Sequence, residues 1–197
     1  MKSLQPDEVY QSRWPSCTHR YKSFLILFVI ISLISISPAH AEQVKATGTI
    51  DAYFSPHGGC TEAIVKEITN AKTEILVQAY SFTSKPIAKA LVDARRRGVK
   101  IEVILDRSQR SQKYSSADFV AHAGIPTYID SVHAIAHNKI MIIDRSTLVT
   151  GSFNFTKAAE DKNAENLLIM KGNKALVDRY FQNFCENRGH SERYEGR

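Results

Sequence analysis

The chain has 197 residues, of which 43% are hydrophobic and 23% charged, with 26 basic residues against 20 acidic ones. This length and balance are typical of one globular domain and exclude a disordered or fibrous protein. The net charge of +6 is compatible with a polyanionic partner, but a basic excess is more often simply a solvated surface.

The first 41 residues have the pattern of an export signal. Four basic residues precede an uncharged, mostly apolar run over residues 24–37, and a cleavage site of the A-x-A type ends at Ala41. The sequence therefore predicts a signal peptide over residues 1–41 and a periplasmic or secreted working domain. Because the basic region is long, the alternative is an uncleaved anchor in the inner membrane, which alone would bring a membrane contact.

Strand and helix patterns alternate over residues 42–187, the predicted working domain. Strands are predicted over residues 49–54, 73–81, 99–105, 125–129, 135–144, 146–151 and 166–170. Helices are predicted over residues 60–71, from Ser84 to just before Gly98, near 115–123 and over 173–186. This order predicts an α/β domain with a mixed β-sheet that helices cover on both faces. Residues 188–197 form a polar tail that is expected to fray.

Two cysteines, Cys60 and Cys185, remain after the predicted signal. An exported protein meets an oxidising compartment, which favours a disulfide between them. Two buried thiols are the alternative, because spacing alone does not supply the geometry of a bridge.

Four polar side chains recur with strand spacing in the second half of the chain. If residues 137–143 form a strand, His137 and Lys139 project from the same face, and Ser152 and Asn154 repeat this arrangement on or just after the next strand. An imidazole, an ammonium, a hydroxyl and an amide that converge suit a phosphate group. The pattern therefore predicts phosphoryl chemistry at the ends of two neighbouring strands.

These residues resemble the signature of the phospholipase D superfamily, H-x-K-x4-D followed by G-S-x-N. The matching residues are His137, Lys139, Asp144, Gly151, Ser152 and Asn154. The likeness is greatest to the small, exported, single-motif Nuc-type endonucleases. It extends through the segments QAYSFTS, RRRGVK and NAENLL, and so covers most of residues 50–185.

The resemblance implies hydrolysis of phosphodiesters through a covalent phosphohistidine, with no metal or other cofactor. His137 would be the nucleophile, and Glu165 looks like the acidic residue that orients it by a hydrogen bond. Lys139 would balance charge on the phosphoryl oxygens. A second histidine must protonate the leaving oxygen, and a chain with one motif implies that a second copy supplies it, hence a homodimer.

The remaining signature residues would have supporting roles. Ser152 and Asn154 would position the phosphate or the histidines. Asp144 is included among the catalytic residues, with the expectation that it supports the strand end electrostatically.

Basic residues outside the signature are candidates for substrate contacts. Arg107, Arg110 and Lys113 follow the third predicted strand, and loops after strands often contact substrate. The single motif, the resemblance to Nuc-type endonucleases and the basic working domain together imply a sequence-nonspecific endonuclease acting on DNA, with RNA as a further candidate substrate. A phospholipase D acting on phospholipid headgroups is the alternative.

No metal site is predicted from ligand spacing. His57, His122 and His133 have no metal-ligand spacing with one another or with Cys60 and Cys185.

Overall fold

The computed structural model of the protein describes residue 41 and residues 43–197. The predicted signal or anchor segment, residues 1–41, thus lies almost wholly outside the described residues. Within residues 43–197, no helix has the length and apolar character that crossing a membrane requires.

A single mixed sheet of eight strands organises the described part of the chain. Its strands are β1 (Thr49–Ser55), β2 (Glu74–Ala79), β3 (Lys100–Asp106), β4 (Thr127–Asp130), β5 (Lys139–Ile143), β6 (Thr147–Gly151), β7 (Glu165–Lys171) and β8 (Glu192–Tyr194). They lie in the order β1-β7-β6-β5-β2-β3-β4-β8. The pairs β2–β3 and β3–β4 are parallel, and the other pairs are antiparallel.

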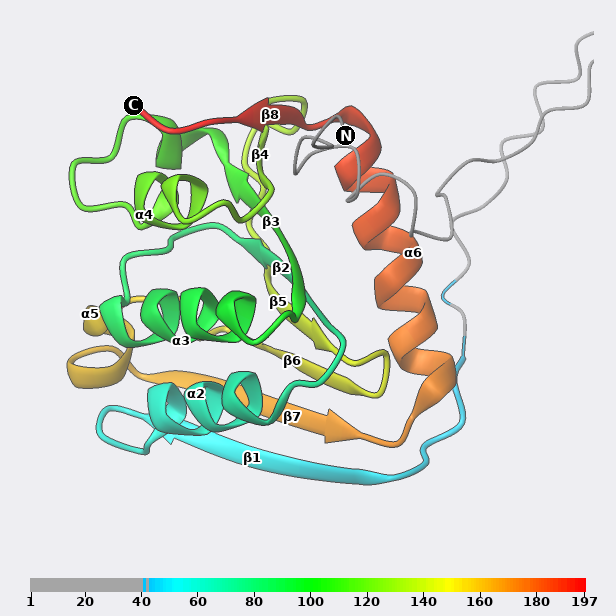
Figure 1. The fold of residues 1–197 in the computed structure, drawn as a ribbon. Helices are drawn as coiled ribbons and strands as arrows, with labels where there is room; N and C mark the ends of the chain where they lie inside the picture. Colours follow the sequence, from blue (N-terminus) through cyan, green and yellow to red (C-terminus); the bar gives the residue numbers. More distant parts are fainter. Residues whose placement is uncertain (1–40, 42) are drawn as a thin grey trace, which may run out of the picture. The chain divides into compact units, whose positions relative to one another are not determined.

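Helices cover both faces of this sheet, as predicted. The helices are α2 (Cys60–Asn70), α3 (Lys85–Arg96), α4 (Ala117–His122), α5 (Lys157–Asp161), α6 (Lys174–His190) and the 3₁₀ turn η1 (Arg107–Arg110). Figure 1 shows α2, α3 and α4 along one side of the sheet, while α6 runs along the other side. The predicted α/β architecture is therefore confirmed.

The largest apolar core lies between the sheet and helices α2 and α3. Ile64 of α2 and Leu91 of α3 are fully buried against alternate strand residues such as Ile75, Val77 and Ile101, which point to the same face. Burial of each such side chain contributes about 1.5–3 kcal/mol. This core holds the central strands in the register that positions the site.

The C-terminal residues are ordered, so the predicted frayed tail over residues 188–197 is wrong. Helix α6 continues to His190, and β8 adds to the edge of the sheet beside β4. Tyr194 is buried and its hydroxyl donates to Asp118, which also forms an ion pair with Arg197. Polar composition misled the prediction because these polar groups find partners that are distant in sequence.

No disulfide joins Cys60 and Cys185, contrary to the expectation from the compartment. Cys60 begins α2 on one face of the sheet, and Cys185 lies in α6 on the opposite face. The sheet separates them by more than a bridge can span. Burial raises the pKa of the Cys60 thiol to about 11, so this thiol is protonated at neutral pH.

Candidate active site

The strand directions bring most of the predicted site residues to one edge of the sheet, where the ends of neighbouring strands lie side by side. Lys139, at the start of β5, lies opposite Ala79, at the end of β2. Because β6 is antiparallel to β5 and β7 to β6, the end of β6 and the start of β7 reach this same edge. The residues at this edge, called here the site edge, are His137, Lys139, Ser152, Asn154 and Glu165.

His137 lies in the loop before β5, not on the strand predicted over residues 135–144, which begins only at Lys139. Its side chain is exposed, and its ring stands against the ring of Tyr80 with the centroids 4.5 Å apart. The loop is held there because Tyr80 donates a backbone hydrogen bond to the carbonyl of Asn138. The imidazole is thus both positioned and open to a substrate.

Lys139 is buried directly beneath this loop. Its Nζ donates to the carbonyl oxygen of His137 at 3.0 Å and lies 5.1 Å from the centroid of the Tyr80 ring. Burial lowers the pKa of the ammonium, and the negative charge of Glu165 partly offsets this effect. An ammonium with few solvent contacts acts more strongly on a nearby phosphoryl oxygen than one in water does.

Two buried phenylalanines fix the segment that follows β6. Phe153 and Phe155 are fully buried, and the backbone N–H groups of Thr83 and Ser84 donate to the carbonyl of Phe155. Asn154, the one residue between them, therefore faces away from the core. Gly151 begins the segment with φ +148°, and a Cβ there would lie 2.3 Å from the carbonyl oxygen of Asn166.

Ser152 and Asn154 differ in the hydrogen bonds that their side chains form. Ser152 Oγ accepts hydrogen bonds from the backbone N–H and the side-chain amide of Asn166, so this hydroxyl ties β6 to β7. Asn154 Oδ1 is buried and has no hydrogen-bond donor among the described residues. A buried amide oxygen without a donor is costly, so Asn154 is available to a group that enters the site.

Glu165 lies at the site edge, but it does not form the expected hydrogen bond to His137 within the described chain. Its Oε1 accepts from Asn163, and its backbone pairs with Ser55 in β1. Its charge reaches Lys139, as the pKa of that lysine indicates. Glu165 therefore acts on the ammonium in this chain, and the residue it was expected to orient is held by Tyr80.

Asp144 lies at the opposite end of β5, about 16 Å from Lys139 along the strand. Its carboxylate accepts from the backbone N–H groups of Lys72, Thr73 and Glu74 and from the hydroxyl of Thr73, at 2.7–3.1 Å. Burial alone would raise the pKa of Asp144, but these hydrogen bonds lower it overall. The predicted supporting role agrees with this geometry, and a catalytic contact does not.

The three predicted basic contacts lie beyond the end of β3, two strands away from β5. Arg107 and Arg110 are in η1, and Lys113 follows it; all three side chains are exposed. Arg110 forms an ion pair with Glu192 at 2.7 Å, and Lys113 lies over the ring of Tyr114. The carboxyl end of β3 is at the site edge, so these cations flank the site without touching its other residues.

Sequence reasoning missed Tyr80 and Gln78. Tyr80 contacts both His137 and Lys139, and Gln78 is buried in β2 with neither amide atom hydrogen-bonded. The available signal was their position at the end of a buried strand, because such ends meet ligands in open α/β sheets.

Comparisons with known proteins agree with this geometry. The family described as cardiolipin synthase, PLD-like domain, matches residues 64–187. A protein of Rickettsia prowazekii named phospholipase D is 40% identical over 163 residues, which are 83% of this chain and 76% of that protein. A mitochondrial cardiolipin hydrolase of Canis lupus familiaris is 30% identical over 117 residues, 59% of this chain and 46% of the other.

A solved structure has the same fold. The crystal structure of Nuc from Salmonella typhimurium, a phospholipase D family member, matches with a TM-score of 0.73 and 35% identity. The match covers 76% of this chain and 100% of the Nuc chain.

Proposed function

Because this chain belongs to the phospholipase D family and is therefore a phosphodiester hydrolase, we propose that it cleaves DNA without sequence preference through a phosphohistidine on His137. One observation supports this most: the exposed imidazole of His137 and the buried ammonium of Lys139 lie at the site edge and both contact the ring of Tyr80. A nucleophile and a charge-stabilising cation are the two groups that the first chemical step needs.

The proposed reaction has two steps. In the first, a ring nitrogen of His137 forms a bond to phosphorus while the bond from phosphorus to the leaving oxygen breaks, and a second, protonated histidine gives its proton to that oxygen. In the second, this histidine takes a proton from water, whose oxygen bonds to phosphorus as the bond to His137 breaks. Lys139 stabilises the charge on the non-bridging oxygens in both steps.

The second histidine is proposed to be His137 of a second copy. The other described histidines are His57, His122, His133 and His190, and none of them forms a hydrogen bond or ring contact with His137, Lys139 or Asn154 among the described residues. A twofold axis at the site edge would bring two copies of His137 and Lys139 onto one phosphate. Asn154 Oδ1, which has no donor within residues 43–197, is then available to an imidazole N–H.

The flanking cations support a nucleic acid as substrate. Arg107 and Lys113 are exposed on the loop after β3, where they can contact backbone phosphates on either side of the one that is cleaved. Contacts of this kind do not distinguish bases, so cleavage without sequence preference is expected. RNA has the same backbone charge and remains a second substrate of this class.

Phospholipids are the second candidate substrates, and two observations favour them. The relatives described above from Rickettsia prowazekii and Canis lupus familiaris are named phospholipase D and mitochondrial cardiolipin hydrolase. In addition, Val132 and Ile135 are 67% and 60% exposed in the loop that leads to His137, where apolar side chains suit a lipid surface. Export through residues 1–41, to the periplasm or beyond, is also proposed and is compatible with either substrate.

A direct assay separates these substrates. The purified protein is incubated with plasmid DNA, RNA or phosphatidylcholine vesicles, each with and without excess chelator. We expect plasmid nicking that persists in chelator, with a rate that falls steeply as salt rises. Cleavage of the vesicles alone would establish the lipid alternative. Activity lost in chelator while a melting curve in the same buffer is unchanged would contradict the metal-free mechanism.

Mixing subunits tests the shared site. Wild-type protein and His137→Asn protein are unfolded together in equal amounts and refolded, so that subunits assort at random. If one site needs both copies of His137, only dimers of two wild-type chains are active, and a quarter of the wild-type activity is expected. Retention of half would show that each chain has an independent site. A mixture with His122→Asn, an exposed histidine at the end of α4, is the control and should keep full activity.

A further inference from the structure

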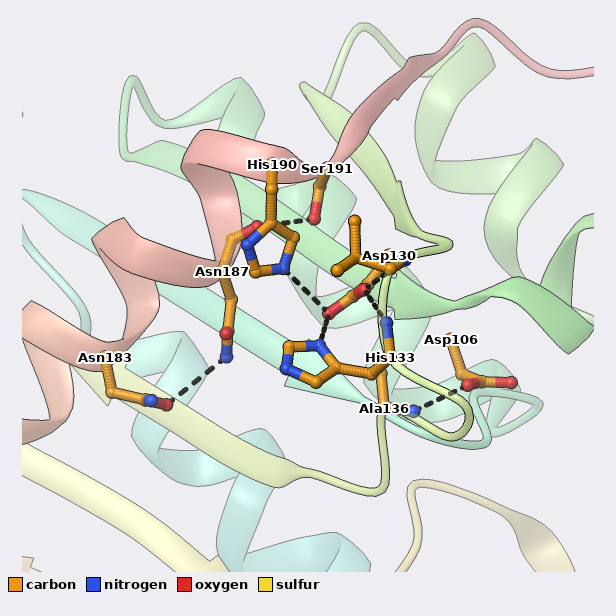
Figure 2. A network of polar contacts seen from close by, with 9 residues as sticks. Asp106, Asp130, His133, Ala136, Asn183, Asn187, His190 and Ser191 are labelled. Carbon is orange, nitrogen blue, oxygen red and sulfur yellow. Dashed lines mark hydrogen bonds and ion pairs between the residues drawn. The ribbon is translucent and has the colours of Figure 1, made fainter. Parts of the chain in front are cut away.

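A second cluster of polar side chains lies beyond the site edge, where β4 ends beside α6. Figure 2 shows Asp130 between two imidazoles, those of His133 and His190. Asp130 is the last residue of β4, His133 is in the loop that follows, and His190 is the last residue of α6. We propose that these three residues bind one divalent cation of the zinc class and so fasten the loop that leads to His137.

The donor atoms have the separations that such an ion requires. Asp130 Oδ2 lies 2.8 Å from His133 Nδ1 and 3.3 Å from His190 Nε2, and all three atoms lie within 4.8 Å of one another. Ligands at the usual zinc distances of about 2.0–2.2 Å lie about 3.3 Å apart in a tetrahedral site. A cation can therefore bind between these atoms after small side-chain movements, with water as the fourth ligand.

The carboxylate is already oriented for this role. Asp130 is 1% exposed, and its other oxygen, Oδ1, accepts from the backbone N–H groups of Val132 and His133 at 3.1 and 3.2 Å. Hydrogen bonds that hold a ligand group in place are the usual support of a metal site. Oδ2 is left to the two imidazoles, so the oxygen that points to them is the one a cation would take.

Solvent exposure of the imidazoles and the C-terminus of helix α6 both favour a cation at this position. The side chains of His133 and His190 are 50% and 33% exposed, which leaves a path for an ion from solvent. His190 ends a helix of 17 residues, and the carbonyl groups at a helix C-terminus favour a positive charge. Two neutral imidazoles and one carboxylate are a ligand set suited to zinc and not to magnesium or calcium.

The loop between β4 and β5 has few contacts that fix its position. Val132 and Ile135 are exposed, so the loop between β4 and β5 gains little from apolar packing. Its second attachment is the backbone N–H of Ala136, which donates to Asp106 at 2.8 Å, and His137 follows directly. A cation held by β4, the loop and α6 would restrict the segment that carries the nucleophile.

This site is separate from the proposed reaction centre. β4 lies three strands from β5 in the sheet, or about 14 Å at the usual strand spacing. The cation would therefore stabilise the loop and take no part in phosphoryl transfer. Ligand spacing did not reveal the cluster because Asp130 and His190 are 60 residues apart in the sequence.

Zinc binding to the full chain tests the proposal. Metal-free protein is titrated with zinc chloride by calorimetry, and its thermal unfolding is followed with and without zinc. We expect one zinc ion per chain and, at zinc about 100 times its Kd, a rise in Tm of about 5–10 °C. Amide hydrogen exchange over residues 131–136 should slow in the same samples. Four-coordinate Co²⁺ in place of zinc should give visible absorption bands.

Matched variants decide whether these three residues are the ligands. His133→Ala and His190→Ala should each lower the zinc affinity at least about 100-fold and abolish both the Tm rise and the cobalt bands. His122→Ala removes another exposed histidine and should behave as the wild type does. Each Tm shift compares one variant with and without zinc, so any change in basal stability cancels. Unchanged zinc binding in both ligand variants, or none in the wild type, would overturn the proposal.

Discussion

Replacement of His137 by asparagine is expected to lower kcat by about 10⁴-fold or more, because the variant lacks the nitrogen that bonds to phosphorus. The fold should survive, since the side chain is exposed and its replacement should change the free energy of unfolding by less than about 0.5 kcal/mol. Plasmid nicking measures the activity, and circular dichroism with a melting curve measures the fold.

The matched control for this prediction is His122→Asn, which changes an exposed histidine away from the site edge and should leave kcat unaltered. A second variant, Tyr80→Phe, keeps the ring that contacts His137 and should retain most of the activity. Near-normal turnover of His137→Asn would remove this residue as the nucleophile. A large loss in the control would instead indicate a general effect of surface histidines on the assay.

Replacement of Asp144 by alanine is expected to produce the largest loss of stability, about 2–4 kcal/mol. The variant loses the acceptor for three backbone N–H groups and the Thr73 hydroxyl. Asp144 also has φ +50°, which alanine tolerates poorly and asparagine well, so Asp144→Asn should cost about half as much. Urea unfolding measures both free energies, and kcat of the folded protein should change little.

The pH dependence of this loss follows from the pKa of Asp144, which lies below its usual value in the folded protein. A lowered folded pKa means that the stabilisation is complete above the unfolded pKa, about 3.9, and disappears as pH falls through the folded pKa. The difference in unfolding free energy between wild type and Asp144→Asn should therefore shrink below about pH 4. A loss of kcat comparable to that of His137→Asn would contradict the structural role.

Local patterns in the sequence were sufficient to predict the order of strands and helices and to recognise the family. Strand alternation and helical spacing depend on neighbouring residues, so all the predicted strands and helices of residues 43–197 have counterparts, most of them within a few residues of the predicted ends. The spacing of His137, Lys139, Ser152 and Asn154 also correctly predicted that they share one sheet edge. The strand predicted over residues 135–144 begins only at Lys139, because apolar residues in the exposed loop before it mimic a strand pattern.

The remaining features of the fold and of the site depend on contacts between segments that are distant in sequence. Asp144 belongs to the same motif as Lys139, yet a strand of five residues carries it to the other edge, where Lys72 and Thr73 bind it. The polar C-terminal residues are ordered because β4 offers an unpaired edge. Tyr80 meets His137 through the pairing of β2 with β5. Chain length and composition predicted one globular domain, and the N-terminal pattern predicted its export. Only the pairing of strands places His137, Lys139 and Asn154 at one end of the sheet, because these contacts join segments that are distant in sequence.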